Sequence, residues 1–230
     1  MSSSARTLAA GALTALGLAV AAASTTTAAP PPATPEHADP SPEQIAQIER
    51  YYDSGAWRRD ADAVAARALT YLRKAVRRAR DPRRLVVVFD VDDTALSTYD
   101  CMKDGQFTDA RRTYCVVGDP HPAIAGSLKL YRWAQARKVR VAFVTGRPDY
   151  VRTVTEQQLR AAGFGGRYEL KLRPSDDRRV SVVPFKSSAR KALQRGGRTV
   201  VLNVGDQRSD LAGGFAKRTF KLPNPMYTLP

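Results

Sequence analysis

Four apolar runs in the sequence end directly before residues that can bind a cation or a phosphate group. These residues are Asp90, Asp92 and Asp93 after VVVF, Thr145 and Gly146 after VAFV, Lys186 after SVVPF, and Asp206 and Asp210 after VVLNV. Carboxylates are the ligands that hard divalent cations prefer. A hydroxyl, a lysine and the amides of a glycine turn can hold phosphoryl oxygens. The combination indicates a site for one divalent cation and one phosphate.

The first acidic group predicts a division of chemical roles. A carboxylate that attacks a phosphate dianion is repelled by it, and a cation such as Mg2+ bound by Asp90 and Asp206 would offset that repulsion. Asp90 ends its strand and is the candidate nucleophile, forming an aspartyl phosphate that water then hydrolyses. Asp92 can point to the same side of an extended chain. It would protonate the leaving group and then activate the water.

The remaining residues are predicted to support this reaction. Thr145 and the turn amides at Gly146 would hold phosphoryl oxygens, and Lys186 would neutralise the charge that spreads over them in the transition state. Asp210 would hold Lys186 or a metal-bound water in place. Asp93 is interpreted as a turn and supporting residue rather than as a catalyst.

A calcium-binding loop is the sharpest alternative for the first acidic group. Such a loop needs carboxylates at positions 1, 3 and 5, a glycine at position 6 and a glutamate at position 12. With Asp90 at position 1, those last three positions hold Thr94, Ala95 and Cys101. The pattern therefore excludes a loop of this kind.

The elements that must position these residues follow from the periodicity of the apolar residues. Strands are predicted at 85–89, 139–144, 168–172, 180–183 and 199–204, and helices at 45–52, 56–79, 122–137, 149–162, 186–195 and from about 207. The apolar stripe of the second helix, which begins at Trp57, is interpreted as core packing. Alternating strands and helices predict an α/β fold with a parallel sheet covered by helices on both faces. Ligands bind beyond the carboxyl ends of such strands, where all four groups converge.

Composition divides the chain into three parts. Residues 1–29 combine Arg6, an apolar run and a stretch of small residues, a pattern typical of a secretory signal peptide. A retained membrane anchor is the alternative. The proline-rich segment 30–42 is predicted to be a linker, and residues 43–230 one domain of ordinary size. Residues 97–122 form a loop-rich insert after the first strand, which we expect to rim the site.

The net charge of +15 favours anionic partners. The basic residues are dispersed along the sequence rather than gathered in one tract, so charge alone does not predict a nucleic-acid-binding protein. No firm nucleic-acid or membrane partner follows from the sequence. A phosphorylated small molecule is the expected substrate.

Cys101 and Cys115 are the only cysteines in the chain. An exported protein would carry them in an oxidising compartment, which favours a disulfide over two buried thiols. Zinc binding is disfavoured because only His37 and His121 could add nitrogen ligands. We interpret His121, which lies between two prolines, as a turn residue.

FDVDDT, VTGRP, the lysine of PFKSSARKAL, and GDQRSDL occur in this order and resemble the four motifs of the haloacid dehalogenase (HAD) superfamily. More narrowly, residues 43–230 resemble its secreted acid phosphatase branch: subfamily IIIB, the class B and C acid phosphatases and the plant vegetative storage proteins. The resemblance implies a three-layer Rossmann-like fold with a short cap insert after the first strand. It implies an Mg2+-dependent phosphomonoesterase that is secreted or held in the cell envelope.

The resemblance also assigns roles to single residues. Asp90 matches the nucleophile, and Asp92 matches the acid/base, with its backbone carbonyl as a further Mg2+ ligand. Thr145 matches the phosphate-binding hydroxyl and Lys186 the motif lysine. Asp206 and Asp210 match the acidic motif next to the metal.

Two other functions stay open at the level of sequence. A storage or binding protein of the same fold would have lost useful turnover, although the presence of Asp90 favours activity because storage relatives can lack the nucleophile. A basic protein that binds nucleic acid or an acidic polymer would show salt-sensitive retention on DNA that survives the loss of Asp90.

Overall fold

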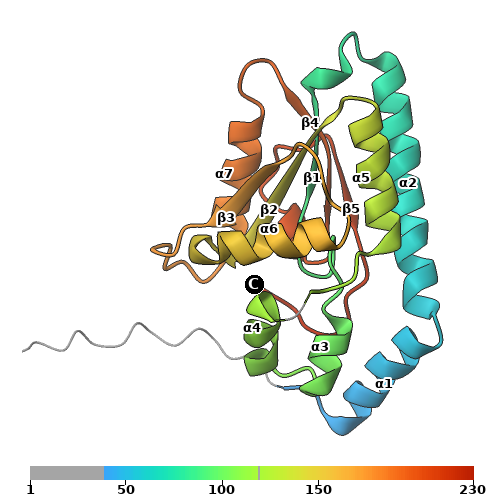
Figure 1. Cartoon of the computed structure of the whole chain (residues 1–230), viewed down its shortest axis with the longest axis vertical. Coiled ribbons are helices and arrows are strands. Elements are labelled where there is room, and N and C mark those ends of the chain that lie inside the picture. Colours follow the sequence, from blue (N-terminus) through green and yellow to red (C-terminus); the bar gives the residue numbers. More distant parts are fainter. Residues whose placement is uncertain (1–38, 119) are drawn as a thin grey trace, which may run out of the picture. The chain divides into compact units, whose positions relative to one another are not determined.

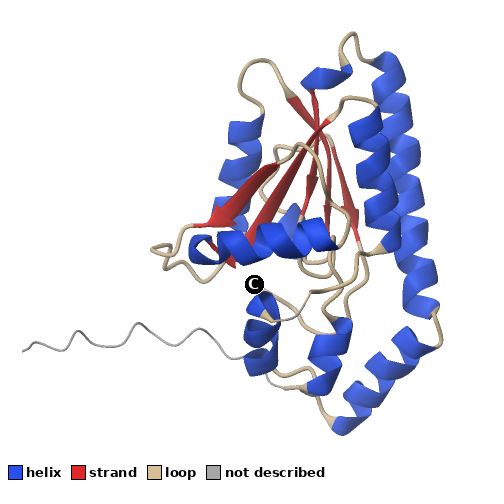
Figure 2. Ribbon diagram, in the orientation of Figure 1, coloured by secondary structure: helices blue, strands red, loops and turns tan. Residues whose placement is uncertain are grey.

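A five-stranded parallel sheet forms the centre of the chain in the computed structural model, which describes residues 39–118 and 120–230 (Figures 1 and 2). Its strand order is β3-β2-β1-β4-β5, and every neighbouring pair is parallel. The strands are β1 (Leu85–Phe89), β2 (Arg140–Pro148), β3 (Glu169–Arg173), β4 (Thr199–Gly205) and β5 (Arg218–Lys221). The predicted parallel α/β fold is therefore confirmed.

Helices bury both faces of the sheet, and β1 shows why its sequence is continuously apolar. Val87 and Phe89 point into a core shared with α2 (Ala56–Arg78), α5 (Ala125–Ala136) and α6 (Arg152–Ala161). Val86 and Val88 point to the opposite face, which α7 (Val183–Leu193) covers. Because successive side chains alternate between faces, a strand buried on both sides needs apolar residues at every position. Trp57 belongs to the α2 side of this core, as predicted.

The insert after β1 holds two short helices rather than loops alone. These are α3 (Tyr99–Asp104) and α4 (Asp109–Val117), joined by the disulfide between Cys101 and Cys115. The expected disulfide is thus present. His121 lies outside any helix or strand, as expected for a residue between two prolines. Its side chain is buried, and its Nε2 donates to the Cys115 carbonyl at 2.7 Å.

Helix α1 (Pro42–Asp53) closes the far side of the insert. It begins with a capping box in which the Ser41 and Gln44 side chains bond each other's backbone amides, and a proline occupies its first turn. Its Tyr52 ring stacks between Trp57 of α2, at 4.7 Å between centroids, and Tyr99 of α3, at 3.9 Å. This stack fixes the insert to the helical layer of the core.

The predicted strand at 180–183 is absent, and α7 begins at Val183 instead of residue 186. The run VSVV alternates like a strand, but Pro184 follows it and has no amide hydrogen to donate to a ladder. Proline is favoured in the first turn of a helix, which is where Pro184 lies. Strand β5 was not predicted, because its sequence RTFK contains only one apolar residue among polar ones.

Reduction of the disulfide is expected to lower the free energy of unfolding by about 3 kcal/mol, since the bond restricts the unfolded chain. Urea unfolding with and without a reductant measures the difference. The Cys101→Ser/Cys115→Ser double variant serves as the control, because a reductant should not affect its stability. Equal stability of the oxidised protein and the double variant would contradict the expectation.

The predicted signal peptide at 1–29 and most of the predicted linker lie outside the described residues. Helix α1 already begins at Pro42, inside the segment predicted to be linker. Among the described helices, none is both long enough and apolar enough to span a membrane.

Candidate active site

The predicted site residues converge beyond the carboxyl ends of the central strands. Five of them arise from three elements of the sheet layer and two neighbouring helices, and they line one cavity of about 520 Å3. They are Asp90 after β1, Thr145 in β2, Lys186 in the first turn of α7, Asp206 after β4, and Asp210 in α8 (Arg208–Leu211). Lys186 lies in a helix, as predicted, but the strand predicted just before that helix is absent.

Three carboxylates and one amine form the centre of this cavity. Asp90, Asp206 and Asp210 each place an oxygen within 4.8 Å of the others, and all three side chains are buried. The Lys186 Nζ donates to Asp90 at 2.6 Å and to Asp210 at 2.5 Å. Burial alone would lower the pKa of Lys186, but the charges of Asp210 and Asp90 outweigh it and raise the pKa. The lysine is therefore held as a cation.

The three carboxylates can carry three negative charges, whereas Lys186 supplies one positive charge. Burial raises the pKa of Asp90 well above its usual value, and the charge of Lys186 offsets this only in part. Burial and the charges of Asp210 and Asp93 likewise raise the pKa of Asp206 to about 7. Buried acids of this kind are stabilised by a further cation.

The donor set fits a hard divalent cation. All three clustered ligands are carboxylate oxygens, the type that Mg2+ selects, and no sulfur or imidazole takes part among the described residues. Asp206 is fixed for this purpose, because it accepts from the Thr94 hydroxyl at 2.8 Å and from the Asn224 amide at 2.8 Å. These two bonds fix the orientation of the Asp206 carboxylate beside Asp90 and Asp210.

The close packing of α8 against β4 sets the position of Asp210. A Cβ at Gly205 would lie 2.4 Å from the Asp210 Cβ, so only glycine allows the helix to approach the strand end. The other Asp210 oxygen accepts from the Gln207 backbone at 2.8 Å. The buried guanidinium of Arg190 donates to the backbone carbonyl of Asp210 at 2.7 Å.

Asp92 is held by a residue that the sequence analysis did not select. The Arg147 guanidinium donates two hydrogen bonds to the Asp92 carboxylate, at 2.9 Å from Nε and 2.6 Å from Nη2. Arg147 is itself buried and donates to Thr155 and Gln158 of α6. Burial would raise the pKa of Asp92, but the charge and bonds of Arg147 lower it below its usual value. Arg147 thus fixes the position of the predicted acid/base and favours its ionised form.

Asp93 has the supporting role that its position suggested. It adopts a left-handed backbone conformation with φ of 52°, and its oxygens accept from the Thr98 amide and hydroxyl. The Tyr227 hydroxyl donates to it at 2.6 Å. These contacts tie the turn after β1 to both the insert and the C-terminal segment.

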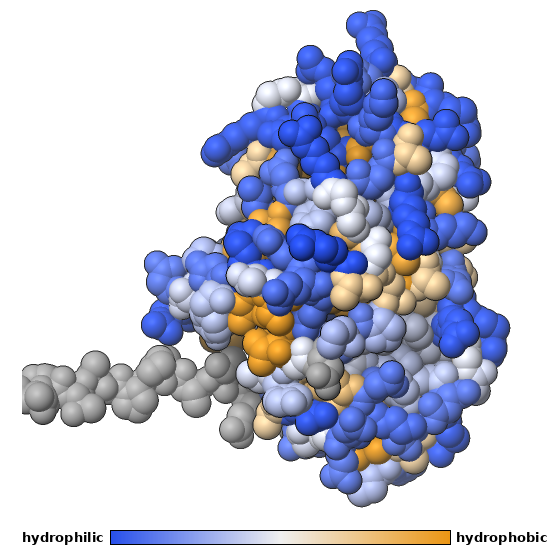
Figure 3. Space-filling model, in the orientation of Figure 1, coloured by the Kyte–Doolittle hydropathy of each residue, from blue (hydrophilic) through white to orange (hydrophobic). Residues whose placement is uncertain are grey.

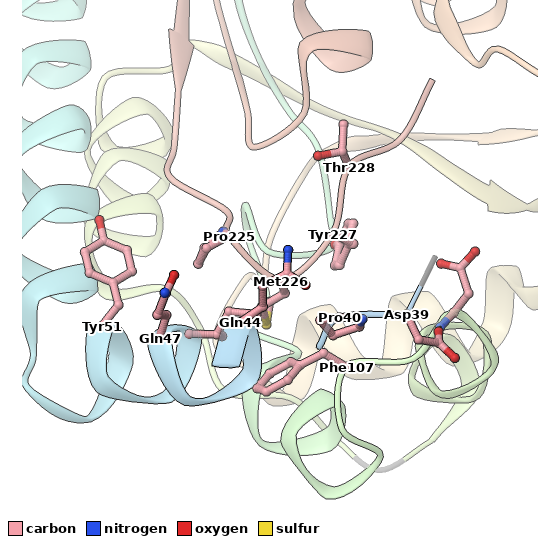
Figure 4. A pocket seen from close by; sticks show the side chains of 12 residues that line it. Asp39, Pro40, Gln44, Gln47, Tyr51, Phe107, Pro225, Met226, Tyr227 and Thr228 are labelled. Carbon is pink, nitrogen blue, oxygen red and sulfur yellow. The ribbon is translucent and has the colours of Figure 1, made fainter. Parts of the chain in front are cut away.

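The C-terminal segment closes one side of the site. Tyr227 lines the cavity that contains the carboxylate cluster and also a separate cavity of about 460 Å3 between α1 and residues 225–228 (Figure 4). Gln207 also joins this segment to the site, because its side-chain oxygen accepts from the Leu229 amide at 3.0 Å.

Thr145 and Gly146, the predicted phosphate-binding residues, line the cavity. The Thr145 hydroxyl is buried in the cavity wall and accepts from the Arg147 amide at 3.1 Å. Gly146 follows it in the same wall. The cavity that contains the carboxylate cluster is therefore also lined by a residue with a hydroxyl group.

Apolar side chains surround the polar centre of the cavity. Val117 of α4, Tyr150 and Val180 line it and are 51%, 77% and 51% exposed. Figure 3 shows an apolar patch between α4 and α6, at this level of the molecule. If the phosphate of a substrate lay beside Asp90, the leaving group of that substrate would contact these apolar side chains.

Comparison with known proteins agrees with this geometry. The family described as HAD superfamily, subfamily IIIB (acid phosphatase), matches residues 13–230. Acid phosphatase 1 of Solanum lycopersicum is 36% identical over 193 residues, which cover 81% of this chain and 75% of that protein. The Stem 28 kDa glycoprotein of Glycine max is 32% identical with the same coverage. Vegetative storage protein 1 of Arabidopsis thaliana is 31% identical, over 63% of this chain and 56% of that protein.

Among solved structures, the class C acid phosphatase of Bacillus anthracis has the same fold. It superposes with a TM-score of 0.65 at 16% identity, covering 81% of this chain and 85% of that one. The fold and the aspartate cluster thus define a phosphatase scaffold of the HAD type. The chain belongs to the acid phosphatase family, subfamily IIIB of the HAD superfamily.

Proposed function

We propose that the protein is an Mg2+-dependent phosphomonoesterase that works through a phosphoaspartate on Asp90. The observation that carries this proposal is the arrangement around Asp90. One of its oxygens is held by Lys186, and no donor among the described residues occupies the other. Asp90 and Thr145 line the same cavity. In this proposal, the Asp90 oxygen without a donor attacks the phosphorus atom.

The roles of the other groups follow from their positions. Lys186, beside Asp90 and Asp210, stabilises the negative charge on the phosphoryl oxygens, and the Thr145 hydroxyl with the Gly146 turn binds them. Asp90, Asp206 and the Asp92 carbonyl would hold Mg2+. When bound, this ion reduces the repulsion between carboxylate and phosphate.

Asp92 is the proposed proton donor to the leaving group and, afterwards, the base that activates water. The Arg147 pair favours its ionised form, so a protonated Asp92 is populated mainly at acidic pH. Leaving-group protonation is therefore favoured under acidic conditions. Arg147 is a positioning residue in this scheme, because its contacts with α6 hold the carboxylate beside the cavity.

The substrate is a phosphorylated small molecule. The apolar rim of Val117, Tyr150 and Val180 supports an alcohol or phenol with an apolar portion. A storage function is the second candidate, favoured by the names of the two Arabidopsis relatives, vegetative storage proteins 1 and 2. The complete set of predicted catalytic residues favours turnover over storage.

We infer that the protein is exported and works outside the cell or in its envelope. The signal pattern at 1–29 and the disulfide between Cys101 and Cys115 both support export. In this proposal the mature protein begins after residue 29, and residues 43–230 are the catalytic domain.

Hydrolysis of a chromogenic aryl phosphate between pH 4 and 8 tests the proposed metal dependence. We expect EDTA to lower the rate at least about tenfold and Mg2+ to restore it, because the carboxylates alone repel the substrate. Ca2+ is the matched control: it prefers more ligands at longer distances and should restore less activity. Full activity in EDTA would exclude the metal-dependent mechanism.

A further inference from the structure

Basic residues precede or begin every strand of the sheet. They are Arg83 and Arg84 at β1, Lys138 and Arg140 at β2, Arg167 at β3, Arg195 and Arg198 at β4, and Lys217 and Arg218 at β5. Because the strands are parallel, the residues at β1 to β4 share the edge of the sheet opposite the candidate site, while β5 begins level with Leu202 of β4. The end of α2 adds Arg77, Arg78 and Arg80. We call this set of residues the amino edge.

The positive charge of the amino edge is poorly compensated. Only two carboxylates pair with it among the described residues: Asp81 with Arg83 at 2.9 Å, and Glu169 with Arg198 at 3.1 Å. Arg84 and Arg195 are exposed and have no carboxylate partner in the described part of the chain. Strongly hydrophilic side chains cover the top of the view in Figure 3, where the loop between α2 and β1 lies.

Part of the amino edge is hollowed. A depression of about 570 Å3 is lined by Arg83, Arg84, Arg140, Arg195 and Arg198 together with Asp81 and Gly196. A Cβ at Gly197 would lie 2.5 Å from the Arg84 guanidinium, so the glycine turn lets that side chain lie against the backbone. A second depression of about 520 Å3 shares Arg83 and Arg140 and extends to Arg167. The two depressions share Arg83 and Arg140, so arginine residues from near the starts of β1, β2, β3 and β4 line neighbouring hollows.

The composition of this surface selects among anions. Guanidinium groups match pairs of phosphate oxygens, and arginine outnumbers lysine on the amino edge. Readers of single-stranded bases need exposed aromatic platforms. Here Trp133 is partly buried and already faces Arg73 and Arg137, and Tyr168 packs against Phe143. The surface suits a phosphate backbone rather than bases.

The dimensions suit a chain of phosphates rather than one. Five strands at a spacing of about 4.8 Å make the edge roughly 20 Å wide. A linear polymer with a negative charge on each unit can contact several guanidinium groups at once, and each contact releases a counterion.

We propose that the amino edge is a binding surface for a linear phosphate polymer, recognised through its backbone. The catalytic cavity lies at the other end of the strands, so a bound polymer leaves it open. This anchoring would hold the protein on a phosphate-rich polyanion. It does not depend on the proposed catalytic mechanism, because no residue of the amino edge lines the catalytic cavity.

Fluorescence anisotropy with labelled duplex DNA and labelled polyphosphate tests the proposal over 50–300 mM salt. The test variant combines Arg84→Gln, Arg167→Gln and Arg195→Gln. The matched control combines three exposed arginines elsewhere, Arg58→Gln, Arg67→Gln and Arg178→Gln, and changes the net charge by the same amount. Labelled poly-glutamate supplies carboxylates without phosphate.

We expect the slope of log affinity against log salt for DNA to fall by about 3 in the test variant and by less than 1 in the control. Hydrolysis of aryl phosphate by both variants should match that of the wild type. Binding of polyphosphate but not DNA, or of both, identifies the source of the phosphate. Equal losses in the two variants would overturn the proposal, as would equal affinity for poly-glutamate or no binding of either phosphate polymer.

Discussion

Replacing Asp90 with asparagine is expected to lower kcat/KM for an aryl phosphate by at least about 1,000-fold, because the amide cannot attack phosphorus to form the covalent intermediate. The change keeps the shape of the side chain. Lys186 keeps its bond to Asp210, so the cluster stays assembled. Steady-state kinetics in saturating Mg2+ measure the loss, and circular dichroism establishes that the variant is folded.

The stability of this variant separates a chemical role from a structural one. Burial raises the pKa of Asp90, so the folded protein gains little from its charge in the absence of metal. We expect the metal-free variant to be at least as stable as the wild type and to gain less stability from Mg2+. Asp100→Asn, an exposed carboxylate on the insert, is the matched control and should keep full activity. Retention of a metal-dependent rate by Asp90→Asn would exclude the phosphoaspartate route.

The sequence predicted which residues converge at the cavity, because each of them follows an apolar run and this pattern can be seen without knowledge of distant contacts. Asp90 and Asp206 follow β1 and β4, and parallel strands bring their ends together whatever the loops do. Asp210 was also accessible, since it lies one helical turn after Asp206. These assignments did not require the order of the strands in the sheet. They required only the rule that the carboxyl ends of parallel strands lie at the same edge of the sheet.

Arg147 and Tyr227 escaped this reasoning for a physical reason. Arg147 lies in VTGRP, but nothing in that segment shows that its guanidinium turns back to Asp92, 55 positions earlier. Tyr227 lies 134 positions from Asp93 and outside any predicted element. Long side chains that bridge distant segments are determined by packing, which periodicity does not encode. A buried polar partner for each carboxylate was the only available signal.

The positions of the basic residues in space were also not predictable from their spacing in the sequence. Their dispersal along the sequence argued against a binding surface, but one or two before each strand become neighbours when the sheet forms. Spacing in sequence therefore says little about surface charge in a parallel α/β fold. Positive and negative side chains are separated along the strand direction: the basic side chains lie where the strands begin, and the carboxylates lie where the strands end.

Lys186→Met is expected to affect both activity and stability, because this cation is bonded to two of the three clustered carboxylates. Methionine keeps the volume and helix propensity of the side chain but removes its charge. Loss of a preorganised donor to the phosphoryl oxygens is expected to lower kcat about 100- to 1,000-fold. Urea unfolding in EDTA should show a loss of about 3–5 kcal/mol, since a buried ion pair loses one partner.

Mg2+ should increase the stability of Lys186→Met more than that of the wild type, because the ion supplies the positive charge that the cluster lacks in the variant. Mg2+ should not restore the activity, because it cannot replace the hydrogen-bond donor that Lys186 directs at the phosphate. Adding Mg2+ should therefore change the stability of the variant but not its rate. Lys191→Met, an exposed lysine on the same helix, controls for the loss of charge. If Lys186→Met kept its rate within threefold of the wild type, the lysine would be a structural partner of Asp210 alone, and the charge stabilisation of the transition state would have to come from the metal and Thr145.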